Sequence, residues 1–301
     1  MYKEIVVSFT PRSKLRITWY RISLISLLAI ALNLVLSFSV LSQSDSLYRL
    51  WNQANLGTQH RDSIVHQTKI YSSSCVTNLQ QQKFTAALAN CKQVVKSNPE
   101  NLEAHLNLGL AYYHLHDYPR AIAQNRQVIE QNSRDYRAFY NWGLIDSAKG
   151  EYQQAIERYQ VALDLVANNS QTEQALILND IGAAWIMLKN YDAAIASLDR
   201  AVELDLNSLA GYFNRGCANH RQGNYQEGIA DFTQVIALDA NYTEAYISRA
   251  ILEHLTRQEK AAYSDLDVAL RQYQTAGNSA AREKIINLKN SMVASKVQQT
   301  A

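Results

Sequence analysis

The fold is decided by residues 209–242, which read LAGYFNRGCANHRQGNYQEGIADFTQVIALDANY. In the first half, apolar residues recur every three or four positions, as at Leu209 and Phe213, and the same spacing returns in the second half around Phe232. Between the halves stands Gly223, followed by asparagine, a pair that favours a turn over a helix interior. The stretch therefore predicts two α-helices joined by a short turn, a helix hairpin.

This pattern recurs along most of the chain. It is anchored by a glycine in the first helix of the hairpin, and the anchor glycines are 34, 39 and 34 residues apart. They are Gly109, Gly143, Gly182 and Gly216, and the anchor position is held by Cys75 in the unit before them and by Ala250 in the unit after. A second small residue follows twelve positions later, at Ala87, Ala121, Ala155, Ala194, Gly228 and Ala262. Small residues at both positions let two helices cross closely, so each unit should be a hairpin.

Six units are predicted, at residues 68–101, 102–135, 136–169, 175–208, 209–242 and 243–276. One hairpin cannot bury its own apolar face, so neighbouring hairpins must stack, and we expect an all-α fold, an α-solenoid. A last helix at residues 278–297 should cover the end of the stack. The insertion before the fourth unit begins at Ser170, where Ser-Gln-Thr-Glu matches the capping box of a helix N-terminus.

Composition excludes several classes of function. Three prolines and ten glycines in 301 residues are too few for the many turns of an all-β chain. The formal net charge is only +2, so no nucleic-acid partner is expected. The chain has no phosphate-binding glycine loop, nucleophile motif or metal-ligand spacing, and we expect no enzymatic activity, no cofactor and no metal. The alternative is an enzyme whose site residues come together only on folding.

The N-terminal part contains a predicted membrane segment. Residues 22–41 carry no charge and, as a helix, are long enough to cross a membrane. Basic residues cluster in the tail of residues 1–21, which is therefore expected in the cytoplasm, with the repeats on the other side, periplasmic or lumenal. We favour a retained signal-anchor; the alternative is a signal peptide that is cleaved near residue 44, which would give a secreted protein. A juxtamembrane linker with one short amphipathic helix is predicted at residues 45–67.

Three short motifs suggest a family. They are Trp142-Gly143, Gly150-Glu151-Tyr152 followed by Ala155-Ile156, and Asn214-Arg215-Gly216 followed by Gly223-Asn224-Tyr225. With these motifs, and over residues 68–276, the chain resembles the tetratricopeptide repeat (TPR) family. The resemblance implies a concave groove lined by the first helix of each hairpin. The first and last units depart from the family pattern at Cys75 and Glu259, as terminal units often do.

Within that groove, the position two residues before the anchor is polar in every unit. It is held by Ser73, Asn107, Asn141, Asp180, Asn214 and Ser248. An asparagine amide both donates and accepts, so it can pair with the backbone of an extended peptide whatever the side chains of that peptide. The predicted peptide-binding residues are the three asparagines and their apolar neighbours Leu110, Tyr113, Tyr140, Leu144 and Phe213. The alternative is that asparagine is merely favoured by the fold at this position.

Together these features predict a non-enzymatic scaffold that binds a protein or peptide outside the cytoplasm and assists the assembly of a membrane or envelope complex. Its contact with the membrane would be the N-terminal helix. The rival prediction is a structural protein whose groove is filled by its own residues 44–67 or by a second copy, which would make it a homo-oligomer.

Two of the three cysteines, Cys75 and Cys91, should lie opposite each other where the helices of the first hairpin cross. In an oxidising compartment they could form a disulfide. A reduced cysteine is also a small apolar residue suited to a close crossing, so both states remain open at this point.

Overall fold

The computed structural model describes residues 64–300 and, within them, the side chains of residues 71–294. The helices are α2 (Ile64–Gln80), α3 (Phe84–Ser97), α4 (Leu102–His114), α5 (Tyr118–Gln131), α6 (Tyr136–Ala148), α7 (Tyr152–Leu165), α8 (Gln171–Met187), α9 (Tyr191–Leu204), α10 (Leu209–Gln222), α11 (Tyr225–Leu238), α12 (Thr243–Leu255), α13 (Glu259–Thr275) and α14 (Ser279–Thr300). None of these helices is long and apolar enough to cross a membrane. The predicted tail (1–21), membrane segment (22–41) and most of the linker (45–67) lie outside the described residues.

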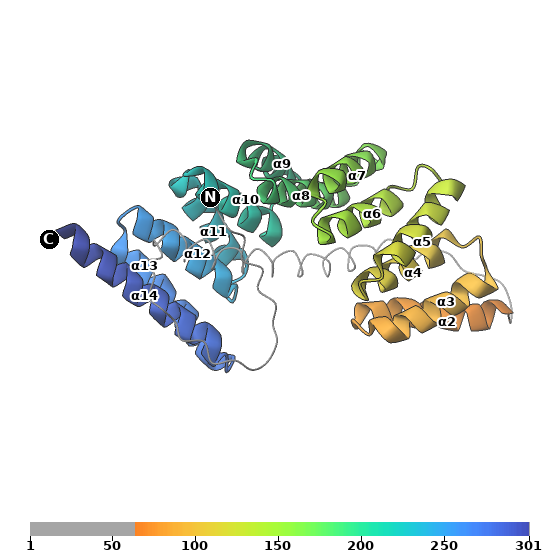
Figure 1. The fold of residues 1–301 in the computed structure, drawn as a ribbon, viewed down its shortest axis with the longest axis horizontal. Coiled ribbons are helices and arrows are strands. Elements are labelled where there is room, and N and C mark those ends of the chain that lie inside the picture. The colour runs from red at the N-terminus through yellow and green to blue at the C-terminus, as the bar shows by residue number, and fades with distance from the viewer. Residues whose placement is uncertain (1–63, 301) are drawn as a thin grey trace, which may run out of the picture.

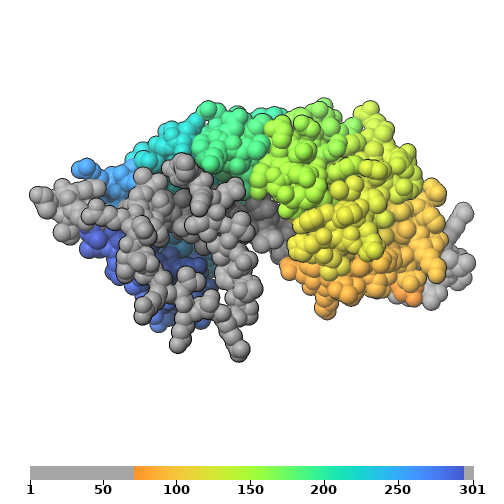
Figure 2. Space-filling view, viewed as in Figure 1, coloured from red at the N-terminus to blue at the C-terminus, as the bar shows by residue number. Residues whose placement is uncertain are grey.

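Consecutive helices pair into six hairpins, from α2 with α3 to α12 with α13, and each hairpin packs against the next. The stack is an arc in which α4, α6 and α8 lie toward the inside and α5, α7 and α9 toward the outside (Figure 1). Neighbouring first helices also touch each other, as α8 and α10 do. Figure 2 shows the arc as a continuous surface from the first hairpin to the last helices. The predicted α-solenoid is confirmed.

The last helix covers the end of this stack. Ile285 and Met292 of α14 are buried in one apolar cluster with Leu266 of α13, and Leu288 packs against the same cluster. Because α13 would otherwise expose an apolar face, α14 acts as the cap that a solenoid needs at its end.

Each hairpin is held by a close crossing between the anchor residue and the residue sixteen positions later. A Cβ atom added to Gly143 would lie 2.5 Å from the ring of Tyr159, and one added to Gly182 would lie 2.5 Å from Leu198. At these distances, a larger anchor residue would overpack the crossing. A small anchor and a large apolar partner therefore set the distance between the two helix axes.

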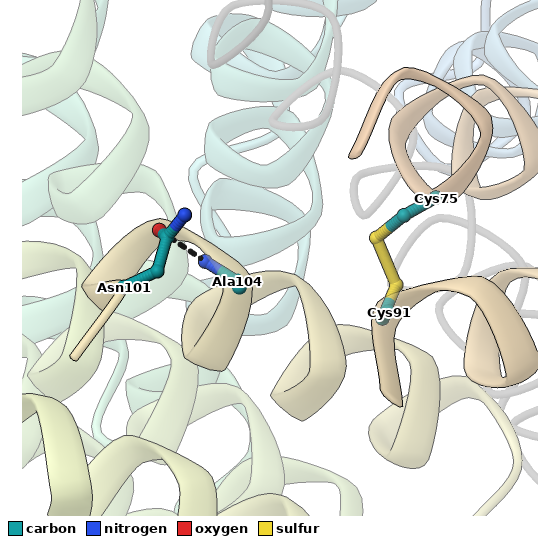
Figure 3. Close-up of a disulfide and its surroundings, with 4 residues drawn as sticks. All are labelled: Cys75, Cys91, Asn101 and Ala104. Atoms are coloured by element: carbon teal, nitrogen blue, oxygen red, sulfur yellow. Dashed lines mark hydrogen bonds between the residues drawn. A yellow bond between two sulfur atoms is a disulfide. The ribbon is translucent and has the colours of Figure 1, made fainter. Parts of the chain in front are cut away.

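The first two hairpins use other chemistry at the same crossing. In the first, Cys75 and Cys91 are joined by a disulfide with a Cα–Cα distance of 5.0 Å (Figure 3). In the second, the partner of Gly109 is Asn125, which is 0% exposed and whose amide oxygen and nitrogen find no hydrogen-bond partner within residues 64–300. A buried amide without partners costs stability, so this crossing is weaker than those filled by leucine or an aromatic ring.

The turns between paired helices share one backbone conformation. The residue seven positions after the anchor has a positive φ in all six hairpins. Glycine takes this position at Gly150 and Gly223, whereas Gln82, His116, Lys189 and Arg257 adopt it with φ between 56° and 62°. Such angles are unfavourable for residues with a Cβ. They are held by a backbone hydrogen bond that closes the end of the first helix, as from Asp117 N to Tyr112 O and from Asn190 N to Trp185 O.

The insertion before the fourth hairpin lengthens its first helix. Helix α8 has 17 residues, whereas α6 has 13. Ser170 is the N-cap residue of α8, as predicted, but its side chain makes no capping hydrogen bond, so the predicted capping box does not form. The extra residues extend the N-terminal end of the helix by about one turn.

Arginine side chains join the fifth and sixth hairpins to the hairpins before them. Arg215 of α10 bonds Asp231 of α11 at 2.6 Å and Asp199 of α9 at 2.8 Å. In α12, Arg249 bonds Asp265 of α13 and also the Thr233 hydroxyl of α11. These cations are therefore occupied by structural contacts.

Candidate functional site: the inner wall of the arc

The candidate site is the inner wall, by which we mean the side chains that the first helices, chiefly α4, α6, α8 and α10, turn toward the inside of the arc. Four of the predicted residues are half-buried, as expected for a surface that a ligand can reach. They are Leu110, Tyr113, Asn141 and Leu144. Leu110 and Tyr113 belong to α4 and the other two to α6, so these residues lie in neighbouring hairpins.

Phe213 was predicted to flank the groove, and this prediction is wrong. The side chain is 0% exposed, and its ring centroid lies 5.5 Å from that of Phe232 and 5.2 Å from that of Tyr242. The physical reason is that Phe213 turns toward α11 and the start of the next hairpin, where it fills the core. A ligand on the inner wall therefore cannot contact this ring.

The asparagines of the wall are less exposed than the sequence suggested. Asn107 and Asn214 are each 2% exposed. The Asn214 amide is already used within the protein, because its Nδ2 donates to Asn179 Oδ1 at 3.0 Å. By contrast, Asn107 Oδ1 has no hydrogen-bond partner among the described residues. The sequence pattern thus identified the polar positions. It did not show which of these side chains are already hydrogen-bonded within the protein.

A chain of hydrogen bonds, the inner polar chain, crosses three hairpins. It consists of Tyr140 on α6, Asp180 and Asn179 on α8, and Asn214 on α10. The Tyr140 hydroxyl donates to Asp180 Oδ2, and Asn179 Nδ2 donates to Asp180 Oδ1 at 3.2 Å. Asn214 donates to Asn179 in turn. All these donors are neutral, and the only group that can carry a full charge at neutral pH is the carboxylate of Asp180.

Burial controls the titration of Asp180. The side chain is 7% exposed, and loss of solvent raises the pKa of its carboxyl from 3.8 to about 6, although the hydrogen bonds from Tyr140 and Asn179 act in the opposite direction. Burial likewise raises the pKa of Tyr113 to about 12, with smaller contributions from Tyr118 and Asp180. The tyrosines around Asp180 therefore stay neutral at physiological pH.

No described basic residue balances this carboxylate. None of the ion pairs among the described residues includes Asp180. Arg137, on the neighbouring α6, is instead held at 2.8 Å by both Glu103 and Asp135. Burial lowers the pKa of His220 to about 4, so this imidazole is neutral at pH 7.

The sequence offered one signal for the site, because Asp180 is the only acid in a column otherwise made of asparagine and serine.

The described residues show no arrangement typical of metal binding. In this part of the chain, no group of three or more histidine, cysteine or acidic side chains could hold a metal ion. The one described free thiol, Cys217, is buried, and burial raises its pKa to about 12, which makes it unreactive at neutral pH. The wall can therefore hold a ligand through apolar contacts and hydrogen bonds.

Comparison with known sequences agrees with this architecture. Models of the tetratricopeptide repeat match residues 78–136 and 140–208, and a further model of the same repeat matches residues 210–242. These matches span more than half of the chain, and the protein belongs to the tetratricopeptide repeat family. No curated protein matches the sequence.

Several solved structures have a similar fold. YrrB, a TPR protein with an unusual peptide-binding site, is 20% identical with a TM-score of 0.52, and the match covers 66% of this chain and 97% of YrrB. PilF of Pseudomonas aeruginosa is 14% identical with a TM-score of 0.62, over 76% of this chain and all of PilF. PilW, a type IV pilus biogenesis factor, is 14% identical with a TM-score of 0.64, over 73% of this chain and 98% of PilW. At these identities the likeness concerns the fold.

We expect replacement of Asp180 by asparagine to stabilise the protein at neutral pH. The folded pKa of Asp180, about 6, is higher than its ordinary value of 3.8, so the folded state holds the proton more tightly than the unfolded state. The contribution of this group to stability is therefore fully present below the unfolded pKa and is lost as pH rises through about 6. At pH 7.5 the buried charge should cost about 3 kcal/mol, since one pKa unit corresponds to about 1.4 kcal/mol.

Thermal unfolding followed by circular dichroism checks this expectation. The midpoint for Asp180→Asn should exceed that of the unchanged protein at pH 7.5 and should match it at pH 4. The control is Asp164→Asn, which removes an exposed carboxylate from α7 and should have little effect at either pH. An equal shift at both pH values would show that burial of the charge is not the cause.

Proposed function

We propose that this protein is a non-enzymatic scaffold that binds an extended polypeptide along the inner wall, outside the cytoplasm, and assists the assembly of a membrane or envelope complex. The observation that carries the proposal is the composition of the wall itself. It combines half-buried apolar side chains, Leu110 and Leu144, with half-buried polar ones, Tyr113 and Asn141. These residues lie on the first helices of two neighbouring hairpins, so one elongated ligand can contact both hairpins.

The choice of a polypeptide rests on the shape and chemistry of this wall. Its first helices follow one another along the arc, so contacts are offered at intervals, as a chain molecule requires. A peptide supplies backbone hydrogen-bonding groups to the half-buried amide of Asn141 and apolar side chains to Leu110 and Leu144. The solved TPR protein YrrB has a peptide-binding site, and PilW takes part in pilus biogenesis. These relatives make the same class of role reasonable for this chain.

The proposed location rests on the N-terminal sequence and on the first hairpin. Basic residues precede the uncharged residues 22–41, and this order favours the repeats on the non-cytoplasmic side. A disulfide between Cys75 and Cys91 suits an oxidising compartment. The N-terminal helix would then anchor the scaffold next to the membrane complex that it serves.

The rival function is self-association, with the inner wall filled by residues 44–67 or by a second copy of the chain. The same surface serves both functions, so the two differ in whether a free peptide can bind to the full-length protein. A wall that is already occupied would select no peptides.

Peptide selection tests the proposed binding surface. A phage-displayed library of random dodecapeptides, selected on the full-length protein, should yield peptides that the double variant Leu110→Glu, Leu144→Glu binds more weakly by about tenfold or more, because apolar contacts are replaced by charge. The matched control is Val161→Glu, at a residue of α7 that is 38% exposed and lies outside the inner wall. Peptides that bind the double variant as well as the unchanged protein would contradict a site on the inner wall.

Thiol trapping in cells tests the location. After acid quenching, denaturation and alkylation with a maleimide-polyethylene glycol without reduction, only Cys217 of the three cysteines should react, and after reduction all three should react. This outcome follows if the first hairpin folds where disulfides form. Three labels on the unreduced protein would place the repeats in a reducing compartment.

A further inference from the structure

We propose that the inner wall selects polypeptide segments that place a lysine or arginine side chain on Asp180. This inference rests on the proposed function, because it names the chemistry of the ligand that the wall would take. It identifies one residue, in the fourth hairpin, as the determinant of that preference.

The first argument is that Asp180 is a buried anion without a counter-charge among the residues that the structure describes. The carboxylate is 7% exposed, and its hydrogen-bond donors in this part of the chain are neutral: the Tyr140 hydroxyl and the Asn179 amide. Arg137, on the same helix as Tyr140, is occupied by Glu103 and Asp135. Buried charges in proteins are normally paired, and an unpaired one marks a place where a partner is missing.

The second argument is that the remaining hydrogen-bonding capacity at Asp180 is for donors. Each oxygen of its carboxylate accepts one hydrogen bond from the described residues, from Tyr140 at Oδ2 and from Asn179 at Oδ1, whereas a carboxylate has about four acceptor sites. A lysine ammonium has three donors and an arginine guanidinium has five, and neither has an acceptor. A basic side chain therefore fits the wall, whereas an acidic ligand would meet the negative charge of Asp180.

The third argument concerns the surroundings of the carboxylate. Leu144 and Ala183 follow the anchor residues of α6 and α8 directly, and both are half-buried. Long basic side chains pack their methylene groups on apolar surface and keep only the terminal charge in polar contact. This register gives the aliphatic part of a lysine or arginine an apolar surface on the two helices that contribute Tyr140 and Asp180.

The fourth argument is that a carboxylate here is unfavourable for the free protein. Asparagine occupies the same position in the second, third and fifth hairpins, so the fold accepts the neutral amide of nearly the same shape. Asp180 adds a charge that burial disfavours, which raises its pKa to about 6. Asp180 is close enough to the half-buried Tyr113 of the wall to affect its pKa, and a residue that weakens the fold next to a binding surface is expected where binding gains from it.

The test repeats the dodecapeptide selection on two full-length proteins, the unchanged chain and Asp180→Asn. Peptides selected on the unchanged chain should be enriched in lysine or arginine at one position, and those selected on Asp180→Asn should not. A selected basic peptide should bind Asp180→Asn about tenfold more weakly, which is the loss expected for one charge-assisted contact. Asp164→Asn, which removes an exposed carboxylate from α7, should leave its affinity unchanged.

Two further measurements separate charge from shape. The same peptide with norleucine in place of its basic residue should bind the unchanged protein about tenfold more weakly and should not distinguish it from Asp180→Asn. Binding of the basic peptide should also fall by about tenfold from pH 7.5 to pH 5, because Asp180 takes up a proton with a pKa of about 6. The other titratable groups facing Asp180 are Tyr113, Tyr140 and Tyr159, whose pKa values are raised, so they do not titrate in this range.

The outcomes distinguish this inference from the proposed function. Peptides that need Leu110 and Leu144 but show no basic preference would overturn the inference and leave the proposed function standing. A basic preference that persists in Asp180→Asn would overturn the assignment to this residue. If neither protein selects any peptide, the proposed function fails and the inference fails with it.

Discussion

The rest of the structure depends on the close crossing of the two helices within each hairpin. A residue with little or no side chain on the first helix lies against a larger residue sixteen positions later on the second, as Gly143 does against Tyr159 and Gly216 against Phe232. The distance at this contact is too short for one more carbon atom, so it sets the separation of the helices and the shape of the unit. Repetition of one unit shape then produces the regular arc in Figure 1.

The curvature of the arc explains why its inner side carries the candidate site. Neighbouring first helices touch one another along the inside, so polar residues on them can bond across hairpins. The inner polar chain from Tyr140 through Asp180 and Asn179 to Asn214 is the result. The same crowding removes water from Asp180, and this desolvation raises its pKa. Stacking therefore creates both the wall and the unusual electrostatics at its centre.

The fold could be predicted largely from the sequence, because the close helix crossing requires small residues at regular intervals. An anchor position that tolerates only small residues shows as glycine or alanine at regular intervals, and Gly150 and Gly223 show where two of the turns lie. The turns at Lys189 and Arg257 carry no glycine in the sequence, because the backbone hydrogen bonds that close these helix ends hold a positive φ on residues that do not favour it. The contact of Asn125 with Gly109 could not be predicted either, because the pattern of small residues on the first helix does not show which residue of the second helix packs against each of them.

The candidate site could be predicted only in part. The polar column is visible in the sequence, and Asn141 and Leu144 have the partial burial expected of a binding surface. Periodicity gives the face of a helix but not how closely the next hairpin covers it, which is why Phe213 was assigned to the groove and lies in the core. The bonding of Asn214 to Asn179 also depends on the approach of two separate hairpins. Such contacts need the three-dimensional structure.

The central claim is that the inner wall, and not the outer helices, binds the partner polypeptide. The most direct test is hydroxyl-radical footprinting of the full-length protein with and without a bound peptide, read by mass spectrometry. Bound peptide should lower the modification of Tyr113 and Leu144, while Val161 and Leu206, which are 38% and 67% exposed, should react as before. Protection of Val161 with unchanged Tyr113 and Leu144 would move the binding surface to the outer helices and contradict the account.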